Sequence, residues 1–325
     1  MRIDRVSRLA RQRAAVIMTV VLAACSEGAT APEGFRGVTD GRITALAGRP
    51  YGVRLGATGV GYVLQFASTS ATRFAAGGGV QGAVALGTDP IDVVFTTAGD
   101  LAYFTTYDGD RVFVVNTQTN AVVDTFAVGA RHHRIVMAPD QSRLWVTTID
   151  GRVLAIDRAS GAPLGSATTG LVNVRAISRH PTTGTLVVSG DFGLRLLDGT
   201  TLDSLTGWTG LGQPQDIVHS TDGSRVFVAF ESGVVRVYDG ISLSATGQIT
   251  FGSAAVHPFG MALSPDGATL VVSSATPAFI ATVDARTLVV RNVIAPGGMP
   301  RRVAFSADGS RAYVANESGW VDVIR

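Results

Sequence analysis

The sequence predicts an all-β fold, a seven-bladed β-propeller, and three observations support this prediction. A cassette of short strands and tight turns recurs along most of the chain. Its strands, such as Leu144–Thr148 and Gly233–Tyr238, are rich in β-branched and aromatic residues with period-two alternation. Asp-Gly and Ser-Gly pairs separate the strands, and these pairs are typical of hairpin turns because glycine reaches positive φ at no steric cost.

The period of the cassette indicates a propeller. We mark each unit by the residue three before its first buried apolar position. The markers are Pro50, Pro90, His132, Asn173, Pro214, Pro258 and Pro300, so the successive spacings are 40, 42, 41, 41, 44 and 42 residues. A period in the forties with four strands per unit is typical of propeller blades. Helical repeats have similar periods, but no window after the N-terminal segment shows a 3.6-residue apolar stripe.

The turns themselves resemble a known repeat family. Ser264–Val272 reads SPDGATLVV and Tyr313–Asn316 reads YVAN. Together they resemble the YVTN-type propeller repeat, in which a PDG turn precedes a strand ending in Tyr-Val-x-Asn. The resemblance spans Gly41–Arg325 and implies a propeller of a family whose members are often extracytoplasmic and have no assigned reaction. The first unit lacks the turn motif, and His180–Thr183 replaces it in the fourth. We interpret the recurring turn aspartates and glycines as structural.

The strand count predicts a closed ring. The seventh unit ends with Trp320–Ile324 and lacks a fourth strand. A matching strand, Gly41–Gly48, precedes the first marker. If this N-terminal strand completes the last blade, the ring has no open edge at its junction. We therefore expect one propeller domain over residues 38–325.

Residues 1–24 are expected to be a lipoprotein signal peptide. The apolar stretch Ala14–Ala24 follows five arginines and is shorter than the roughly 20 residues of a membrane span. Leu22–Cys25 resembles a bacterial lipobox, which implies lipidation of Cys25. The alternative is an ordinary cleaved signal that leaves a thiol. Cys25 is the only cysteine, so internal disulfides are excluded.

The segment 25–37 is small, polar and proline-bearing, and we interpret it as a flexible tether. The predicted localisation is therefore the bacterial cell envelope, with the protein anchored to the membrane through Cys25. Ser26 takes the place of the aspartate that often marks inner-membrane retention in such signals, which favours the outer membrane.

The charge balance argues against a nucleic-acid partner. The chain has 27 basic residues, all arginine, and 25 acidic residues. Residues 1–24 hold five arginines and one aspartate, so 22 arginines and 24 acids remain and the mature domain is near −2. A nucleic-acid-binding face would require clustered positive charge. We expect a monomer that binds an envelope protein, peptide or glycan.

Polar residues that follow the markers are expected to meet at one rim of the ring. The residues two positions after each marker are Gly52, Asp92, Arg134, Arg175, Asp216, Gly260 and Arg302. Concave mouths with converging polar groups are common binding sites. The simpler alternative is that these side chains pair with one another and with water.

The sequence predicts that one arginine of this rim is free to bind a ligand. Asp92 is placed to neutralise Arg134, and Asp216 to neutralise Arg175, whereas Arg302 has only glycine at this position in both neighbouring units. Arginine suits carboxylate-like or sulfate-like groups. The hypothesis is a site for an anionic ligand. Its candidate residues are Arg302 and Arg301, with His257, Phe259 and Tyr51 as walls.

No cofactor, metal site or catalytic residue is predicted. Asp92 and Asp216 lie three units apart, and the histidines lack metal-ligand spacing. There is no nucleophile-elbow motif G-x-S-x-G, no CxxCH and no phosphate loop. The favoured role is a lipid-anchored binding or scaffold module. The alternative is a hydrolase or lyase of the lactonase type that acts at the mouth.

Overall fold

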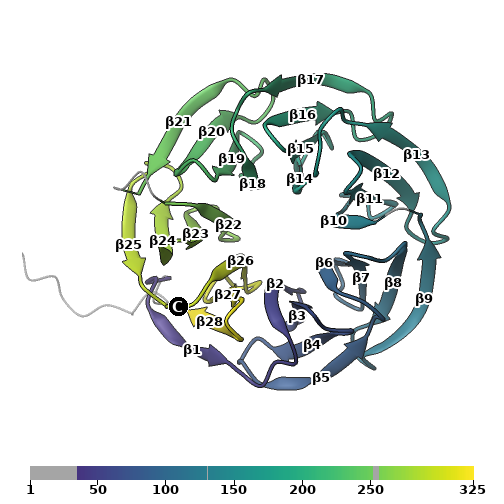
Figure 1. Cartoon of the computed structure of the whole chain (residues 1–325), viewed down its shortest axis with the longest axis horizontal. Helices are drawn as coiled ribbons and strands as arrows, with labels where there is room; N and C mark the ends of the chain where they lie inside the picture. The colour runs from purple at the N-terminus through teal and green to yellow at the C-terminus, as the bar shows by residue number, and fades with distance from the viewer. Residues whose placement is uncertain (1–34, 130, 252–255) are drawn as a thin grey trace, which may run out of the picture. The chain divides into compact units, whose positions relative to one another are not determined.

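The computed structural model describes residues 35–129, 131–251 and 256–325. Every regular element in these residues is a β-strand, and the strands form seven four-stranded antiparallel sheets. The sheets are arranged radially as the blades of a ring (Figure 1). The predicted seven-bladed β-propeller is therefore confirmed. The predicted signal peptide, Cys25 and most of the tether 25–37 lie outside the described residues.

The blades follow the chain in order, and each runs from the centre of the ring outward (Figure 1). Blade 1 contains β2 (Arg49–Leu55), β3 (Val60–Phe66), β4 (Ser70–Ala75) and β5 (Val80–Ala85). Blade 2 contains β6 (Pro90–Phe95), β7 (Leu101–Thr106), β8 (Arg111–Asn116) and β9 (Ala121–Ala127). Blade 3 contains β10 (His132–Met137), β11 (Arg143–Thr148), β12 (Arg152–Asp157) and β13 (Pro163–Thr168).

The other four blades repeat this plan. Blade 4 contains β14 (Ala176–Arg179), β15 (Leu186–Gly190), β16 (Gly193–Leu197) and β17 (Ser204–Thr209). Blade 5 contains β18 (Pro214–His219), β19 (Arg225–Phe230), β20 (Val234–Asp239) and β21 (Ala245–Thr250). Blade 6 contains β22 (Pro258–Leu263), β23 (Thr269–Ala275), β24 (Ala278–Asp284) and β25 (Val290–Ile294). Blade 7 contains β26 (Pro300–Phe305), β27 (Ala312–Asn316), β28 (Trp320–Ile324) and, from the start of the domain, β1 (Thr39–Ile43).

Strand β1 closes the ring as the sequence predicts, although it spans Thr39–Ile43 rather than the expected Gly41–Gly48. It pairs antiparallel with β28, with Thr39 opposite Ile324 and Ile43 opposite Val321. The Arg42 Nε donates to Asp322 Oδ1 over 2.8 Å, and the Arg42 guanidinium lies 4.3 Å from the centroid of the Trp320 ring. The edge of β28 is thereby covered, so blade 7 leaves no unpaired strand next to blade 1.

The core lies between blades, because each sheet is apolar on both faces. Trp145 of blade 3 packs with Leu186 and Leu197 of blade 4, and its Nε1 donates to the Gly199 carbonyl over 3.0 Å. The repeated turns add local support. For example, Asp308 Oδ1 accepts from the backbone N–H of Ser310 over 3.0 Å. The recurring turn aspartates, which we interpret as structural, therefore have hydrogen-bond partners within their own turns.

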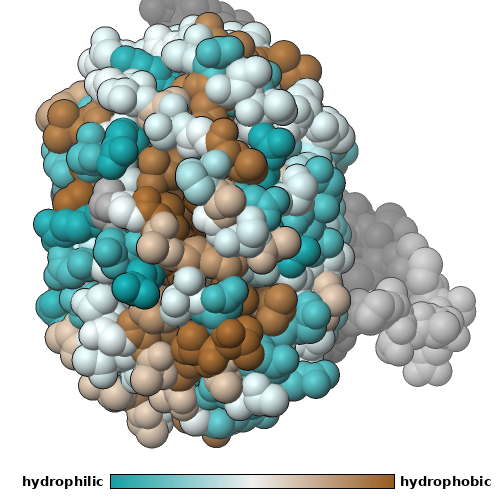
Figure 2. Space-filling view, turned by 90° about the vertical axis from the view of Figure 1, so that its right-hand side faces the viewer, coloured by the Kyte–Doolittle hydropathy of each residue, from teal (hydrophilic) through white to brown (hydrophobic). Residues whose placement is uncertain are grey.

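The outermost strands face solvent and expose some apolar side chains, including Val123 on β9 and Leu164 on β13. Figure 2 shows apolar residues grouped among polar ones on the side of the ring where these two strands lie. Among the described residues, no helix has the length and apolar character needed to cross a membrane.

Candidate functional site at the centre of the ring

The innermost strands bring the seven marker regions together. Four of these innermost strands, β6, β18, β22 and β26, begin at a marker proline. In six blades the pairing of the innermost strand with the next strand shifts register near its first residues. Such β-bulges twist a strand and redirect its side chains. Blade 4 differs, because β14 begins three residues after the marker Asn173.

Four of the marker-region side chains form a buried charged layer, which consists of Asp92, Arg134, Asp216 and Arg302. Each of the four residues is at most 5% exposed. The Arg134 Nη2 donates to Asp216 Oδ1 over 2.7 Å, and Arg134 Nη1 lies 3.4 Å from Asp92 Oδ2. The Arg302 Nη1 donates to the same Asp216 Oδ1 over 3.2 Å. The layer thus connects blades 2, 3, 5 and 7 across the centre of the ring.

The two aspartates also join neighbouring blades through the backbone. Asp92 Oδ2 accepts from the Ile135 N–H of blade 3 over 3.3 Å. Asp216 Oδ2 accepts from the Met261 N–H of blade 6 over 2.9 Å. Each carboxylate therefore satisfies a buried donor on the innermost strand of the next blade. The two aspartates thus have the same structural role, and these hydrogen bonds hold both carboxylates in fixed positions.

The predicted pairing of these charges is partly wrong. Asp92 contacts Arg134 as expected. However, Arg302 has an acidic partner after all, because its guanidinium reaches Asp216 across the ring. Arg175 pairs not with Asp216 but with Asp191 of its own blade, over 3.0 Å and 2.9 Å. The expectation considered only adjacent blades, whereas a long arginine side chain can span the centre of the ring.

Positive charge exceeds negative charge at the centre. Arg54 also reaches Asp92, with Nε 3.5 Å from Oδ1, so three guanidinium groups share two carboxylates. Burial and the neighbouring Arg302 together lower the pKa of Arg134 to about 10, although Asp92 and Asp216 act in the opposite direction. Burial by itself would raise the pKa of Asp92, but Arg134, Arg54 and Arg302 outweigh it and the pKa lies below its usual value. The Nε of Arg302 is buried and has no hydrogen-bond partner among the described residues.

A cavity of about 250 Å³ lies beside the charged layer, at the end of the ring where the innermost strands begin; we call it the mouth cavity. Two arginines and several uncharged polar groups line it, and its lining contains no acidic residue. The lining residues are Tyr51, Tyr107, His133, Ile149, Asn173, Val174, Arg175, Gln215 and Arg302. Burial, Arg302 and Arg134 lower the pKa of His133 to about 3, so its imidazole is neutral at pH 7.

The structure separates the predicted site residues into three groups. Arg302, Arg175 and Tyr51 line the mouth cavity, while Arg134, Asp92 and Asp216 belong to the charged layer next to it. The remaining three residues, Phe259, Arg301 and His257, do not line the cavity.

An aromatic pair stands between the cavity and Arg301. The Tyr51 and Phe259 rings meet edge to face with centroids 5.6 Å apart. The Arg301 guanidinium lies 4.5 Å from the Phe259 centroid and donates through Nε to Glu317 over 2.6 Å. His257 is exposed, and its Nδ1 lies 2.7 Å from the carbonyl of Glu231. Arg302 lies near the same two rings, 5.5 Å from the Tyr51 centroid and 5.6 Å from the Phe259 centroid, so the adjacent arginines share the aromatic pair and differ in their acidic partners, Glu317 for Arg301 and Asp216 for Arg302.

Sequence reasoning from single positions does not find the acidic partners. Asp191 and Glu317 lie in the second-turn loops rather than at a marker, and each accepts from an arginine at the start of the innermost strand of its own blade. The sequence feature that could identify these acids is their spacing, because each lies 16 residues after its arginine partner. No group of three or more possible metal ligands is found within the described residues.

Comparison with known proteins supports the fold and leaves the activity open. No family model matches the chain, and no curated protein sequence does. By structure, 1829 solved chains match, so the fold alone indicates no single function. One of them is the hydrazine synthase of Kuenenia stuttgartiensis, with a TM-score of 0.79 and 19% sequence identity. The match covers 89% of this chain and 98% of that chain, and at this identity it shows a shared propeller fold only.

Proposed function

We propose that this protein is a binding module of the bacterial cell envelope, anchored by a lipid at Cys25. Its mouth cavity would take an anionic group, either of a small ligand or of an acidic side chain on a protein, peptide or glycan partner. The sequence resemblance to YVTN-type repeats and the lipobox-like Leu22–Cys25 support the envelope assignment. The ring supplies the rigid frame on which such a site can be built.

The main support for an anion is the unbalanced positive charge beside the cavity. Arg302 and Arg175 both line it, and its lining contains no acidic residue. Arg175 pairs with Asp191 outside the lining, whereas the Arg302 Nε has no hydrogen-bond partner among the described residues. A carboxylate or sulfate would accept from such donors and offset the surplus charge of the layer. The cavity is slightly smaller than the usual ligand site, so it suits one charged group rather than a whole large molecule.

A lactonase-type reaction has less support from the residues at the centre. Such chemistry needs carboxylates that are free to hold a metal. Here the carboxylates of Asp92 and Asp216 contact arginines and accept backbone N–H groups. We therefore favour binding over hydrolysis at the mouth.

Titration of the purified mature protein with acetate and with sulfate tests this proposal. We expect saturable binding that Arg302→Gln and Arg175→Gln each weaken by about ten- to a hundredfold, since a hydrogen bond to a charged group contributes roughly 1.5–3 kcal/mol. Arg301→Gln is the matched control, because Arg301 is held by Glu317 outside the cavity. Failure of both anions to bind, or equal losses in all three variants, would overturn the assignment.

A further inference from the structure

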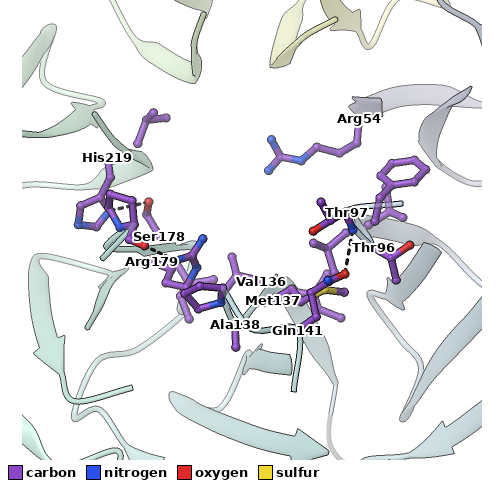
Figure 3. Close-up of a pocket in the computed structure, with 18 of the residues that line it drawn as sticks. Arg54, Thr96, Thr97, Val136, Met137, Ala138, Gln141, Ser178, Arg179 and His219 are labelled. Carbon is purple, nitrogen blue, oxygen red and sulfur yellow. Dashed lines mark hydrogen bonds between the residues drawn. The ribbon is translucent and has the colours of Figure 1, made fainter. Parts of the chain in front are cut away.

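A second and larger cavity lies at the other end of the innermost strands; we call it the opposite cavity. Its volume is about 710 Å³, within the usual range for ligand sites. The ends of the innermost strands of blades 1 to 5 and the turns that follow them form its wall (Figure 3). Because the mouth cavity is built from the beginnings of innermost strands, the charged layer separates the two spaces.

The opposite cavity carries positive charge and no negative charge in its lining. Its ionisable residues are Arg54, Arg179 and His219, and no aspartate or glutamate lines it. The Arg54 side chain is 37% exposed and extends into the cavity from one side, while Arg179 lies on the other (Figure 3). The contact of Arg54 with Asp92 is long, at 3.5 Å, and Asp92 is shared with Arg134.

Arg179 has no carboxylate partner among the described residues. Its Nη1 donates to the carbonyls of His180 and Pro181, over 3.1 Å and 3.2 Å. Burial lowers the pKa of the Arg179 guanidinium. A partly buried guanidinium held only by neutral carbonyls retains unused donors and an uncompensated charge. Such a group is well placed to accept an oxyanion.

The rest of the wall combines apolar surface with neutral polar groups. Val136 and Met137 provide apolar contact, and Gln141 Oε1 is already occupied by the backbone N–H of Thr97 (Figure 3). This mixture suits an organic ligand, because a bare inorganic ion would leave the apolar part of the wall in contact with water.

A hydroxyl–imidazole pair in the wall is better suited to binding than to catalysis. Ser178 Oγ lies 2.8 Å from His219 Nδ1. Burial, His180 and Arg179 lower the pKa of His219 to about 3, which makes it a weak base at pH 7. The His219 Nε2 is buried without a partner among the described residues, so no carboxylate orients the ring as in a Ser-His-acid triad.

We propose that the opposite cavity binds an organic anion, with a carboxylate or phosphate facing Arg54 and Arg179 and an apolar body against Val136 and Met137. This site shares no lining residue with the mouth cavity, although Arg54 also contributes to the charge of the layer between them, so the two sites are tested with different variants. The Ser178 hydroxyl would contribute a neutral hydrogen bond at the edge of the ligand.

Fluorescence titration with 8-anilinonaphthalene-1-sulfonate, an organic anion that brightens in apolar surroundings, tests the site. We expect stoichiometric binding that Arg179→Gln weakens about tenfold or more and that Arg179→Lys weakens less, because lysine keeps the charge and loses the fork. Arg301→Gln is the control and should leave this binding unchanged, because Arg301 lines neither cavity and is held by Glu317. Melting temperatures of all variants show whether each one folds, and Arg54→Gln repeats the test from the other wall.

Competition identifies the chemistry of the ligand. Benzoate or phenyl phosphate should displace the dye, and the better of the two indicates which oxyanion the site prefers. Benzyl alcohol, which has the apolar body without the charge, should displace it at least tenfold less well. The proposal is overturned if the folded Arg179→Gln variant binds the dye as tightly as the unchanged protein, or if benzyl alcohol competes as well as benzoate.

Discussion

At the scale of single residues, the buried charges of the ring are structural first. Asp216 accepts from Arg134, from Arg302 and from the Met261 backbone, so three donors depend on one carboxylate. A buried ion pair contributes little compared with an apolar replacement, but loss of one partner leaves an uncompensated charge. The layer therefore makes the centre of the ring intolerant of single changes.

The first prediction concerns this carboxylate. Asp216→Asn should lower the free energy of unfolding by about 3–5 kcal/mol, because Arg134 loses its shortest ion pair and Arg302 loses its only ion pair within the described residues. Urea unfolding measures the loss. Asp191→Asn is the control, because the pair of Asp191 with Arg175 is more exposed and should contribute less. Similar losses in both variants would contradict this interpretation.

The second prediction concerns pH. The folded protein holds the pKa of His133 and of His219 at about 3, far below the roughly 6.5 of an unfolded chain. Between these values the unfolded state binds protons that the folded state does not, so stability is full above about pH 6.5 and falls as the pH drops toward 3.

Denaturant unfolding across this pH range tests the second prediction. His219→Gln removes one of the two histidines that stay neutral in the folded protein. The slope of stability against pH should therefore fall by about one proton in this window. Gln118→Ala is the control, since Gln118 is exposed and the change removes no titratable group, so it should leave the slope unchanged. An identical slope in the two variants would show that His219 does not resist protonation.

At the scale of elements, the five-residue strand β1 contributes both strand pairing and apolar packing to the closure of the ring. It supplies the fourth strand of blade 7 and places Ile43 in the apolar layer between blades 7 and 1. Hydrogen bonds between Val38 and Arg325 continue the pairing to the end of the chain, at 3.0 Å in both directions. The two ends of the domain are therefore joined by one sheet.

The third prediction follows from this closure. Deletion of 39–48 should lower the melting temperature or cause aggregation, because β28 becomes an exposed edge and the layer around Ile43 opens. Ile43→Ala keeps the strand and should cost about 2–5 kcal/mol, as expected for truncating a buried isoleucine. An unchanged melting temperature after the deletion would mean that the ring does not depend on β1.

At the scale of the whole molecule, the ring offers two different ends for binding. The mouth cavity is small and lies beside the charged layer, whereas the opposite cavity is larger and partly apolar. The partners that are available to the protein depend on where it resides in the cell.

The fourth prediction concerns the anchor. Cys25→Ala should move the protein from the detergent-extracted membrane fraction to the soluble fraction, because several acyl chains, each CH₂ contributing about 0.8 kcal/mol, would be lost. Cell fractionation followed by immunoblotting measures the shift. Ser26→Ala keeps the cysteine and should remain in the membrane fraction. A Cys25→Ala protein that stays with the membrane would contradict the lipobox interpretation.

The architecture can be read from the amino-acid sequence alone, because the relevant information is local and repeated. Turn glycines, alternation and the period specify each blade, and Trp320–Ile324 without a following strand indicates where β1 must pair. Seven repetitions of the same pattern make a misassignment of one blade easy to detect. The candidate rim was also accessible to this reasoning, since equivalent positions of a repeat lie on the same circle.

The pairing of the charges and the position of the cavities, in contrast, depend on the folded ring. Arg134 and Arg302 reach Asp216 over 82 and 86 residues of sequence, so no local pattern indicates the choice. The choice depends on the width of the centre and on the bulges that direct each side chain, and these are properties of the closed ring. The opposite cavity is likewise a property of the closed ring. Arg54 and Arg179 occupy different positions in their repeats, and they line one cavity only because five blades surround it.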